Sequence, residues 1–249
     1  MEFIGEGITP EVRFTYRELF LWHMARYDYA KKHILPSNRV LDVACGTGYG
    51  TYELGMFCRE IRGIDISGEA IEYARRNYNA HNISWQEYDC TKMTNILPAS
   101  SFDVVVSFET IEHLDRQSQF VFVDQISKVL HKDGIAIIST PNVDVYGSPA
   151  VEGPGPKHKY EMNKQEFLDT LKTRFDQVYL LGQAFSDTSK NRWRSMKMAC
   201  IINGLFKLNF RPLIRDYGDY MDKSDLEFSI YNFERALMFL AVCKFPQKE

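Results

Sequence analysis

The sequence has few of the features that mark secreted, zinc-ribbon or membrane proteins. Its five cysteines are scattered, odd in number and without a C-x-x-C pair, which excludes a disulfide framework and a cysteine zinc site. No apolar run approaches the length of a membrane-spanning helix, and the N-terminal segment, with its acids, predicts no signal peptide. The net charge of −3 gives no overall bias toward nucleic acid. These absences predict a cytoplasmic protein, which can still bind peripherally to a membrane surface.

Segments of strand length alternate with segments of helical periodicity along the middle of the chain. The expected strands are 40–43, 61–65, 83–87, 104–108 and 135–139, with helices expected at 68–79 and 117–130. A helix is also expected before the first strand, from Thr9 to Ile34. Alternation of this kind predicts a parallel sheet in an α/β fold. With 249 residues, 45% of them hydrophobic, the chain fits one globular domain.

The most informative segment is RVLDVACGTGYG, residues 39–50. A short apolar run reaches Asp42, and Gly46, Gly48 and Gly50 follow before a helical pattern begins. Glycines can take φ > 0 and admit a ligand where any Cβ would clash, and the helix start presents unpaired N–H groups. The spacing G-x-G-x-G differs from the dinucleotide fingerprint, and the carboxylate of Asp42 should repel a pyrophosphate. The segment therefore predicts a ligand with an ammonium or sulfonium group.

Two more acids end the next expected strands. Asp65 lies nineteen residues after Gly46, where a carboxylate can accept hydrogen bonds from both hydroxyls of a ribose, and Asp89 follows the third strand. Asp42 and Asp65 could instead only cap the turns that follow them. Acids at successive strand ends around a glycine loop favour a ribose-containing ligand, because open α/β sheets bind ligands at these ends.

With these motifs in order, and with ETIEHL after the fourth strand, the chain resembles the class I S-adenosylmethionine-dependent methyltransferases over roughly residues 26–182. The resemblance implies a Rossmann-like sheet of seven strands, the last one antiparallel, with helices on both faces. It implies S-adenosylmethionine as cofactor, with Gly46 and Gly48 at the methionine moiety, Asp42 at its ammonium and Asp89 at the adenine amino group. Further cofactor contacts implied by it are Tyr27, Ala44, Asp65, Ile66, Cys90 and Phe108.

The resemblance also divides the domain. Residues 1–36 are expected to form an N-terminal helical lid, 37–182 the cofactor-binding core, 183–234 a helical acceptor-site insertion and 235–249 the last strand. Within the lid, Arg26 and Tyr27 match a pair that lies near the methionine end of the cofactor in similar enzymes. Tyr27 can equally be an ordinary core residue.

Acids and histidines gather after the fourth strand. Glu109, Glu112 and His113 are spaced i, i+3 and i+4, so a helix that begins there would place them on one face beside the cofactor. His158, in KHKYE after a Gly/Pro-rich loop, is the candidate contribution of that loop to the same site.

Three interpretations of this cluster remain open. The acids can be residues favoured at a helix N-terminus, with His113 a cap or core residue and His158 solvated. Alternatively, His113 is the general base for a hydroxyl acceptor, with Glu112 and His158 beside it. By resemblance to the small-RNA 3′-terminal 2′-O-methyltransferases, Glu109, Glu112, His113 and His158 would hold Mn²⁺, Fe²⁺ or Mg²⁺. Both functional interpretations predict methyl transfer to oxygen.

The acceptor is indicated only by residues 188–215, which contain seven Lys or Arg and no acid, interleaved with apolar side chains. Such a stretch fits an anionic small molecule, a lipid-linked glycan or an RNA end, or is a solvated helical face. We predict methylation of a hydroxyl on a sugar, glycan or related small molecule, because the chain is compact, slightly acidic and without an added RNA-binding module. The alternatives are a metal-dependent RNA 2′-O-methyltransferase and a non-catalytic cofactor-binding scaffold.

Overall fold

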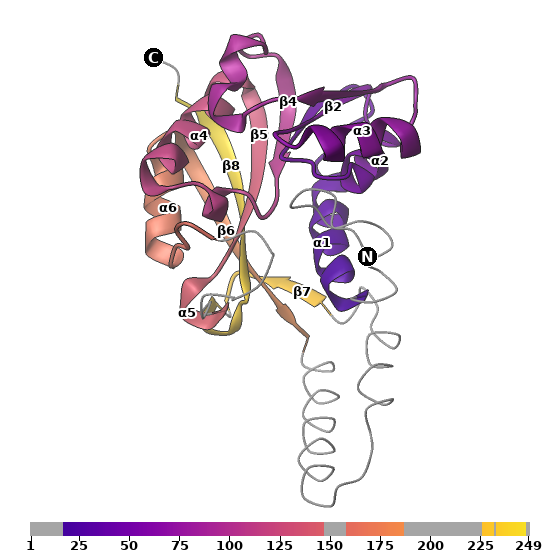
Figure 1. Cartoon of the computed structure of the whole chain (residues 1–249). Coiled ribbons are helices and arrows are strands. Elements are labelled where there is room, and N and C mark those ends of the chain that lie inside the picture. Colours follow the sequence, from indigo (N-terminus) through magenta and orange to yellow (C-terminus); the bar gives the residue numbers. More distant parts are fainter. Residues whose placement is uncertain (1–16, 147–157, 187–225, 232, 248–249) are drawn as a thin grey trace, which may run out of the picture.

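The computed structural model describes residues 17–146, 158–186, 226–231 and 233–247 (Figure 1). Its strands are β1 (Arg39–Val43), β2 (Glu60–Asp65), β3 (Ile83–Glu87), β4 (Phe102–Ser107), β5 (Leu130–Pro141), β6 (Phe175–Phe185), β7 (Leu226–Ser229) and β8 (Met238–Pro246). The α-helices of this part are α1 (Arg17–Lys31), α2 (Tyr49–Gly55), α3 (Gly68–Asn77), α4 (Arg116–Val129), α5 (Val143–Tyr146) and α6 (Lys164–Lys172). Short 3₁₀ helices are η2 (Cys90–Asn95), η3 (Ile111–His113) and η5 (Phe233–Arg235).

The strands form one sheet in the order β3-β2-β1-β4-β5-β8-β6-β7 (Figure 1). Strands β1 to β5 pair in parallel, whereas β8 runs antiparallel to both β5 and β6. The predicted Rossmann-like α/β fold, with an antiparallel last strand, is therefore confirmed, and the structure places that strand between β5 and β6.

The predicted number of seven strands is one too few. Residues Leu226–Ser229 form β7 and pair antiparallel with the end of β6, inside the segment predicted to be a helical insertion. The physical reason is that β6 continues to Phe185, and the backbone groups at its end need partners, which β7 supplies. Residues 187–225 of the predicted insertion, which include the basic stretch 188–215, lie outside the described residues.

Two apolar cores flank the sheet, because successive side chains of a strand point to opposite faces. On β1, Leu41 and Val43 join the core formed with α4 and α6, whereas Val40 joins the core formed with α1 and α2. In Figure 1, α4 and α6 lie on one side of the sheet, and α1, α2 and α3 lie on the other. Because β1 is packed on both faces, the position of its last residue is fixed, and the glycine loop begins from that position.

Helix α1 is the described part of the helix predicted from Thr9 to Ile34; residues 1–16 lie outside the described residues. It packs on α2 through an aromatic contact between Phe20 and Tyr49, whose ring centroids are 5.4 Å apart, and through an ion pair between Lys31 and Glu53 at 3.0 Å. α1 therefore covers the helix that follows the glycine loop.

The strand order reverses between β1 and β4, which are neighbours in the sheet although β2 and β3 separate them in the chain. At such a switch point the loops after the two strands diverge to opposite faces and leave a crevice for a ligand. The glycine loop follows β1 and the acid-rich segment follows β4, so both motifs lie at this crevice. No helix among the described residues combines the length and apolarity needed to cross a membrane.

Candidate functional site

The glycine loop adopts the left-handed backbone that its sequence suggests, but not at every expected position. The residues with positive φ are Ala44 at 57°, Gly46 at 55° and Gly48 at 86°. Gly50 does not use this freedom, because it is already a residue of α2. An alanine held at positive φ beside two glycines is a backbone constraint of the kind that gathers at binding sites.

Asp65 braces this loop from the end of β2. Its Oδ2 accepts the Gly46 N–H at 2.8 Å, and its Oδ1 accepts the Ser67 N–H at 2.8 Å. A carboxylate can accept several hydrogen bonds at once, so bonds to the loop do not prevent bonds to a ribose hydroxyl. The turn-capping role and the ribose-binding role proposed for Asp65 are therefore compatible.

Asp42 lies buried behind the loop. Its Oδ2 accepts hydrogen bonds from Thr51 Oγ1 at 2.6 Å and from Tyr27 Oη at 3.3 Å, whereas its buried Oδ1 has no hydrogen-bond partner among the described residues. Burial raises the pKa of Asp42 to about 7, although the hydrogen bonds from Thr51 and Tyr27 oppose that rise. The carboxyl group therefore exchanges its proton near neutral pH, and a cation placed near Oδ1 would favour the charged form.

Tyr27 combines a core position with a polar contact. Its ring makes edge-on contacts with Phe108, at a centroid distance of 4.9 Å, and with Tyr49, at 5.9 Å. Burial, followed by the nearby carboxyl of Asp42, raises the pKa of Tyr27 well above its usual value. The hydroxyl therefore stays protonated and serves as a donor to Asp42.

Arg26 was expected near the methionine end of the cofactor through its pairing with Tyr27, but no role was predicted for it. Its side chain is 1% exposed; Nη1 donates to Gln183 Oε1 at 2.9 Å and lies 3.9 Å from Glu109 Oε1. Its Nε and Nη2 have no hydrogen-bond partner among the described residues. A buried guanidinium with unused donors is costly unless an anion meets it, and a carboxylate has the matching planar geometry. Only its position beside Tyr27 signalled Arg26 in the sequence.

The far side of the crevice holds the residues expected near an adenine ring. Asp89 accepts the Thr91 N–H at 2.9 Å and the Thr91 hydroxyl at 2.7 Å, and its other oxygen lies 3.1 Å from Lys92 Nζ. Although burial acts in the opposite direction, these contacts lower the pKa of Asp89, so it is an anion at neutral pH. Ile66 directly follows Asp65 and is 71% exposed, an apolar surface open to a ligand. Burial raises the pKa of the Cys90 thiol to about 12, which leaves it uncharged.

The segment after β4 does not form the single helix that would place three side chains on one face. Glu109 has φ 54° and precedes η3, which contains only Ile111–His113. Ser139 holds Glu109 in this conformation: its Oγ accepts the Glu109 N–H at 3.2 Å and donates to Glu109 Oε1 at 2.7 Å. Glu109 therefore faces Arg26, and the close donor group comprises Glu112, His113 and His158 without it.

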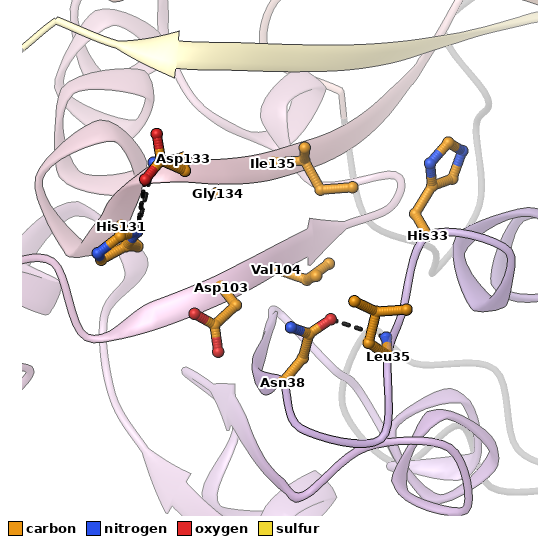
Figure 2. Close-up of a pocket in the computed structure, with 9 residues that line it drawn as sticks. All are labelled: His33, Leu35, Asn38, Asp103, Val104, His131, Asp133, Gly134 and Ile135. Atoms are coloured by element: carbon orange, nitrogen blue, oxygen red, sulfur yellow. Dashed lines mark hydrogen bonds and ion pairs between the residues drawn. The ribbon is translucent and has the colours of Figure 1, made fainter.

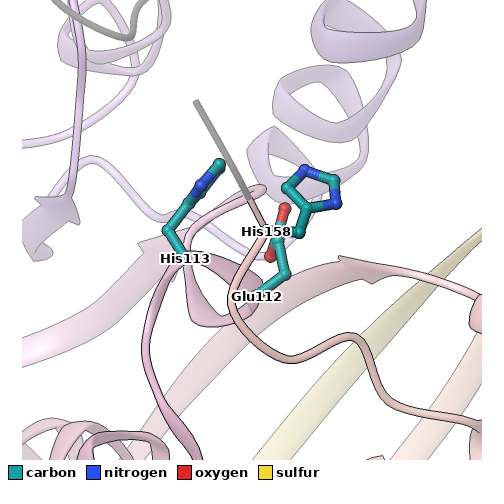
Figure 3. A group of neighbouring side chains, drawn as sticks. All are labelled: Glu112, His113 and His158. Atoms are coloured by element: carbon teal, nitrogen blue, oxygen red, sulfur yellow. The ribbon is translucent and has the colours of Figure 1, made fainter. Parts of the chain in front are cut away.

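Figure 3 shows these three side chains converging from η3 and from the segment that begins at residue 158. One potential ligand atom from each lies within 4.8 Å of those of the others. The rings of His113 and His158 meet edge to face, with centroids 4.9 Å apart. Nδ1 of His158 pairs with Glu161 Oε1, which leaves the opposite ring nitrogen, Nε2, for another contact.

Glu112 is fully buried beside these rings. Its Oε2 accepts a hydrogen bond from Thr140 Oγ1 at 3.3 Å, and its Oε1 has no hydrogen-bond partner among the described residues. Burial, followed by the charge of Glu109, raises the pKa of Glu112 well above its usual value. Burial therefore disfavours the charged form of this carboxyl, and a cation placed beside it would favour that form.

A separate hollow of about 230 Å³ lies at the opposite ends of the parallel strands, where β4 begins (Figure 2). Its lining comprises His33, Leu35, Asn38, Asp103, Val104, His131, Asp133, Gly134 and Ile135. None of the predicted site residues lines it, and parallel α/β sheets bind ligands at the other ends of their strands. The crevice at the carboxyl ends of β1, β2 and β4 is therefore the candidate active site.

Comparison with known proteins agrees with this geometry. Residues 34–199, well over half of the chain, match a family model described as a methyltransferase domain. A probable S-adenosylmethionine-dependent methyltransferase of Mycolicibacterium smegmatis is 33% identical over 142 residues, which are 57% of this chain and 52% of that protein. A ubiquinone biosynthesis O-methyltransferase of Neisseria meningitidis is 32% identical over 121 residues, 47% of this chain and 50% of that protein. The chain thus spans about half the length of these relatives.

Solved structures show the same fold at lower identity. A Thermotoga maritima protein described as an S-adenosylmethionine-dependent methyltransferase and possible histamine N-methyltransferase gives a TM-score of 0.63 at 14% identity. The match covers 96% of this chain and 97% of that one, so it extends over nearly the whole architecture.

Proposed function

The chain belongs to the class I S-adenosylmethionine-dependent methyltransferase family, and on that premise we propose that it methylates a hydroxyl group of a sugar, glycan or related small molecule. S-adenosylmethionine, when bound, supplies a methyl group on a sulfonium that is already a good leaving group. The task of the protein is to hold donor and acceptor in line, an alignment worth about 7–11 kcal/mol at best.

Unused polar atoms in the crevice fit this cofactor. Arg26 Nε and Nη2, which have no hydrogen-bond partner in the described part of the chain, suit the methionine carboxylate, and Asp42 Oδ1, likewise without a partner there, suits the ammonium. Asp65 accepts the ribose hydroxyls, and Gly46 lets the ligand approach the backbone. The missing Cβ of Gly48 instead makes room for the side chains of Trp85 and Ala74. Ala44, Tyr27 and Phe108 line the methionine half; Ile66, Asp89 and Cys90 line the adenine half.

The cluster of Glu112, His113 and His158 carries the proposal of oxygen as the methylated atom. A hydroxyl must lose its proton as it attacks, and an imidazole that titrates near neutral pH is suited to accept it. Nδ1 of His113 is buried, so Nε2 is the atom that takes the proton. His158 lies edge-on to this ring and closes the acceptor side.

The same cluster also has the donor atoms that a divalent ion requires, and one of them is buried. Glu112 Oε1 is buried and has no hydrogen-bond partner in the part of the chain that the structure describes. Glu161 orients His158 as second-sphere carboxylates orient metal-bound histidines. Glu112, His113 and His158 would hold the ion, which would lower the pKa of an acceptor hydroxyl. Glu109, the fourth ligand predicted from the sequence, is turned toward Arg26 and Ser139 instead.

The acceptor class is tested by incubating the purified protein and methyl-labelled S-adenosylmethionine with a cell extract. We expect label in small molecules or glycans, attached through oxygen and stable to nuclease. Label that nuclease releases would support the RNA 2′-O-methyltransferase, and label on nitrogen would contradict the proposed hydroxyl acceptor. No transfer in any fraction, with cofactor binding intact, would support the non-catalytic scaffold.

A further inference from the structure

Residues 158–162, which we call the strap, bring His158 to the acceptor side although they are distant from His113 in the chain. The strap is fastened to η3 through its backbone: the N–H groups of Lys159 and Tyr160 donate to the carbonyl oxygen of Glu112, at 2.8 and 3.1 Å. The place of His158 therefore depends on contacts between the strap and η3 more than on neighbouring sequence.

A second fastening comes from a side chain of α4. Gln119 is completely buried, and its Nε2 lies 2.8 Å from the carbonyl oxygen of Tyr160 in the strap and 3.0 Å from that of Ile111 in η3. A third carbonyl, that of Leu114, lies 3.4 Å away. One amide group thus joins both chain segments that carry the histidines, and its two N–H donors are fully used.

Arg116, one helical turn before Gln119, holds the amide in place. Its Nη1 donates to Gln119 Oε1 at 3.0 Å and to Thr170 Oγ1 at 2.8 Å, and its guanidinium lies over the ring of Tyr160, 5.3 Å from the centroid. The orientation of Gln119, with its Nε2 toward the strap, is therefore determined by a fixed cation on its other side.

We propose that Gln119 is a positioning residue that places His158 for methyl transfer, by tying the carbonyl of Tyr160 in the strap to that of Ile111 in η3. The proposal rests on the proposed function, in which His158 belongs to the acceptor site. Loss of the tie lets the strap shift, and a displacement of about 1 Å at an aligned site can cost about 10²-fold in rate.

Gln125 offers a matched control on the same helix. It is also buried, but its Oε1 accepts the N–H and hydroxyl of Thr94 in η2, at 2.8 and 3.0 Å, away from the strap. Substitution to Met preserves the length of either side chain and removes its hydrogen bonds. Gln119→Met and Gln125→Met therefore make the same chemical change on one helix, but the hydrogen bonds that they remove lead to different segments, the strap and η3 in one case and η2 in the other.

The first measurement is amide hydrogen exchange of the strap, which needs no acceptor. We expect the amides of Lys159 and Tyr160 to exchange at least about tenfold faster in Gln119→Met than in the wild type, and unchanged in Gln125→Met. Equal protection of these amides in Gln119→Met would overturn the proposal. If Gln119→Met does not fold, Gln119→Glu, which keeps side-chain length and an acceptor for Arg116, is measured in its place.

The second measurement is the maximal initial rate of label transfer from methyl-labelled S-adenosylmethionine into the extract fraction that accepts it. We expect Gln119→Met to lower this rate about 10- to 100-fold with an unchanged apparent KM for S-adenosylmethionine. In a His158→Ala background the same substitution should lower it no further, since the residue it positions is gone. Additive losses would show a general structural effect and overturn the proposal.

The two measurements separate the failure of the proposal from that of the proposed function. If His158→Ala transfers label at the wild-type rate, or if the wild type transfers none, the proposed role of His158 fails and Gln119 has no catalytic group to position. Faster exchange of the strap with full transfer activity would overturn the proposal while leaving the proposed function standing.

Discussion

The ring of Tyr27 occupies the space that any side chain at position 50 would need: a Cβ built on Gly50 lies 1.9 Å from Cζ of Tyr27. The third glycine of the motif is therefore required by the packing of α1 on α2. The same contact directs the tyrosine hydroxyl to Asp42 behind the loop, at 3.3 Å.

Gly50→Ala is expected to lower the free energy of unfolding by about 1–3 kcal/mol, because the added methyl group displaces the ring of Tyr27. Urea unfolding measures the change. In Gly68→Ala the new methyl meets only the movable carboxylate end of Glu87, at 2.6 Å, so that variant should lose less. Combining Gly50→Ala with Tyr27→Ala should cost less than the sum of the single changes, and a strictly additive result would contradict the contact.

Asp65→Ala should weaken binding of S-adenosylhomocysteine at least about tenfold, because hydrogen bonds to a charged acceptor contribute about 1.5–3 kcal/mol. Calorimetry on folded protein gives the affinity. Asp103→Ala is the control. Asp103 also accepts a backbone N–H, that of Arg39 at 2.7 Å, but it lies where β1 and β4 begin, away from the crevice. Equal affinity in Asp65→Ala and the wild type would contradict the proposed hydrogen bonds between Asp65 and the ribose.

Asp42 makes stability fall as pH rises. Its pKa in the folded protein is about 7, above the ordinary 3.8, so the folded state holds the proton more tightly and the free energy of unfolding declines between these values. Asp42→Asn removes this titration and keeps an acceptor for Thr51 and Tyr27. The difference in the free energy of unfolding, variant minus wild type, should rise by on the order of 2 kcal/mol from about pH 5 to about pH 8. Parallel stability curves for the two proteins would refute the raised pKa.

His113→Ala should keep cofactor affinity and lose about 10²–10⁴ in kcat, as expected when a general base is removed. His131→Ala is the matched control because that histidine lines the distant hollow. Initial rates and calorimetry together decide between a role in chemistry and one in cofactor binding. Unchanged turnover in His113→Ala would eliminate it as the base.

Methyl transfer is expected to continue in excess EDTA, because the proposed base needs no ion. If EDTA abolishes transfer and Mn²⁺ or Mg²⁺ restores it, the ion held by Glu112, His113 and His158 takes over the activation of the hydroxyl. Under that outcome Glu112→Gln and His158→Ala should each raise the metal concentration needed for half-maximal activity about 10- to 100-fold.

The sequence predicted the parallel half of the fold because its signals are local. Alternating strands and helices, together with acids at the ends of β1 and β2, follow from patterns within a few residues of each other. The extra strand β7 was missed because four residues, LEFS, carry little periodicity and are a strand only through pairing with β6. Pairing between distant segments leaves no mark in either segment alone.

Site residues show the same division. Asp42, Gly46 and Asp65 could be found because their spacing along the chain reflects consecutive strands. Gln119 could not, and for Arg26 the resemblance gave only a position near the cofactor. Each makes its contacts with a distant segment, Arg26 with Gln183 and Gln119 with the strap. The helical face expected for Glu109 failed because Ser139, from the neighbouring strand, holds it in a left-handed conformation.

The pairing of Phe185 with Leu226 has a consequence for how this chain can change. The sheet brings the two residues together, so the segment between them leaves and returns at one point of the edge. For a connection between two residues held in this way, each doubling of its length adds only about 0.6 kcal/mol to the cost of loop closure. Connections of different length between β6 and β7 are therefore compatible with one register of the sheet and one glycine loop. Variation at this point of the sheet can thus accompany an unaltered methyl-donor half, in evolution or by design.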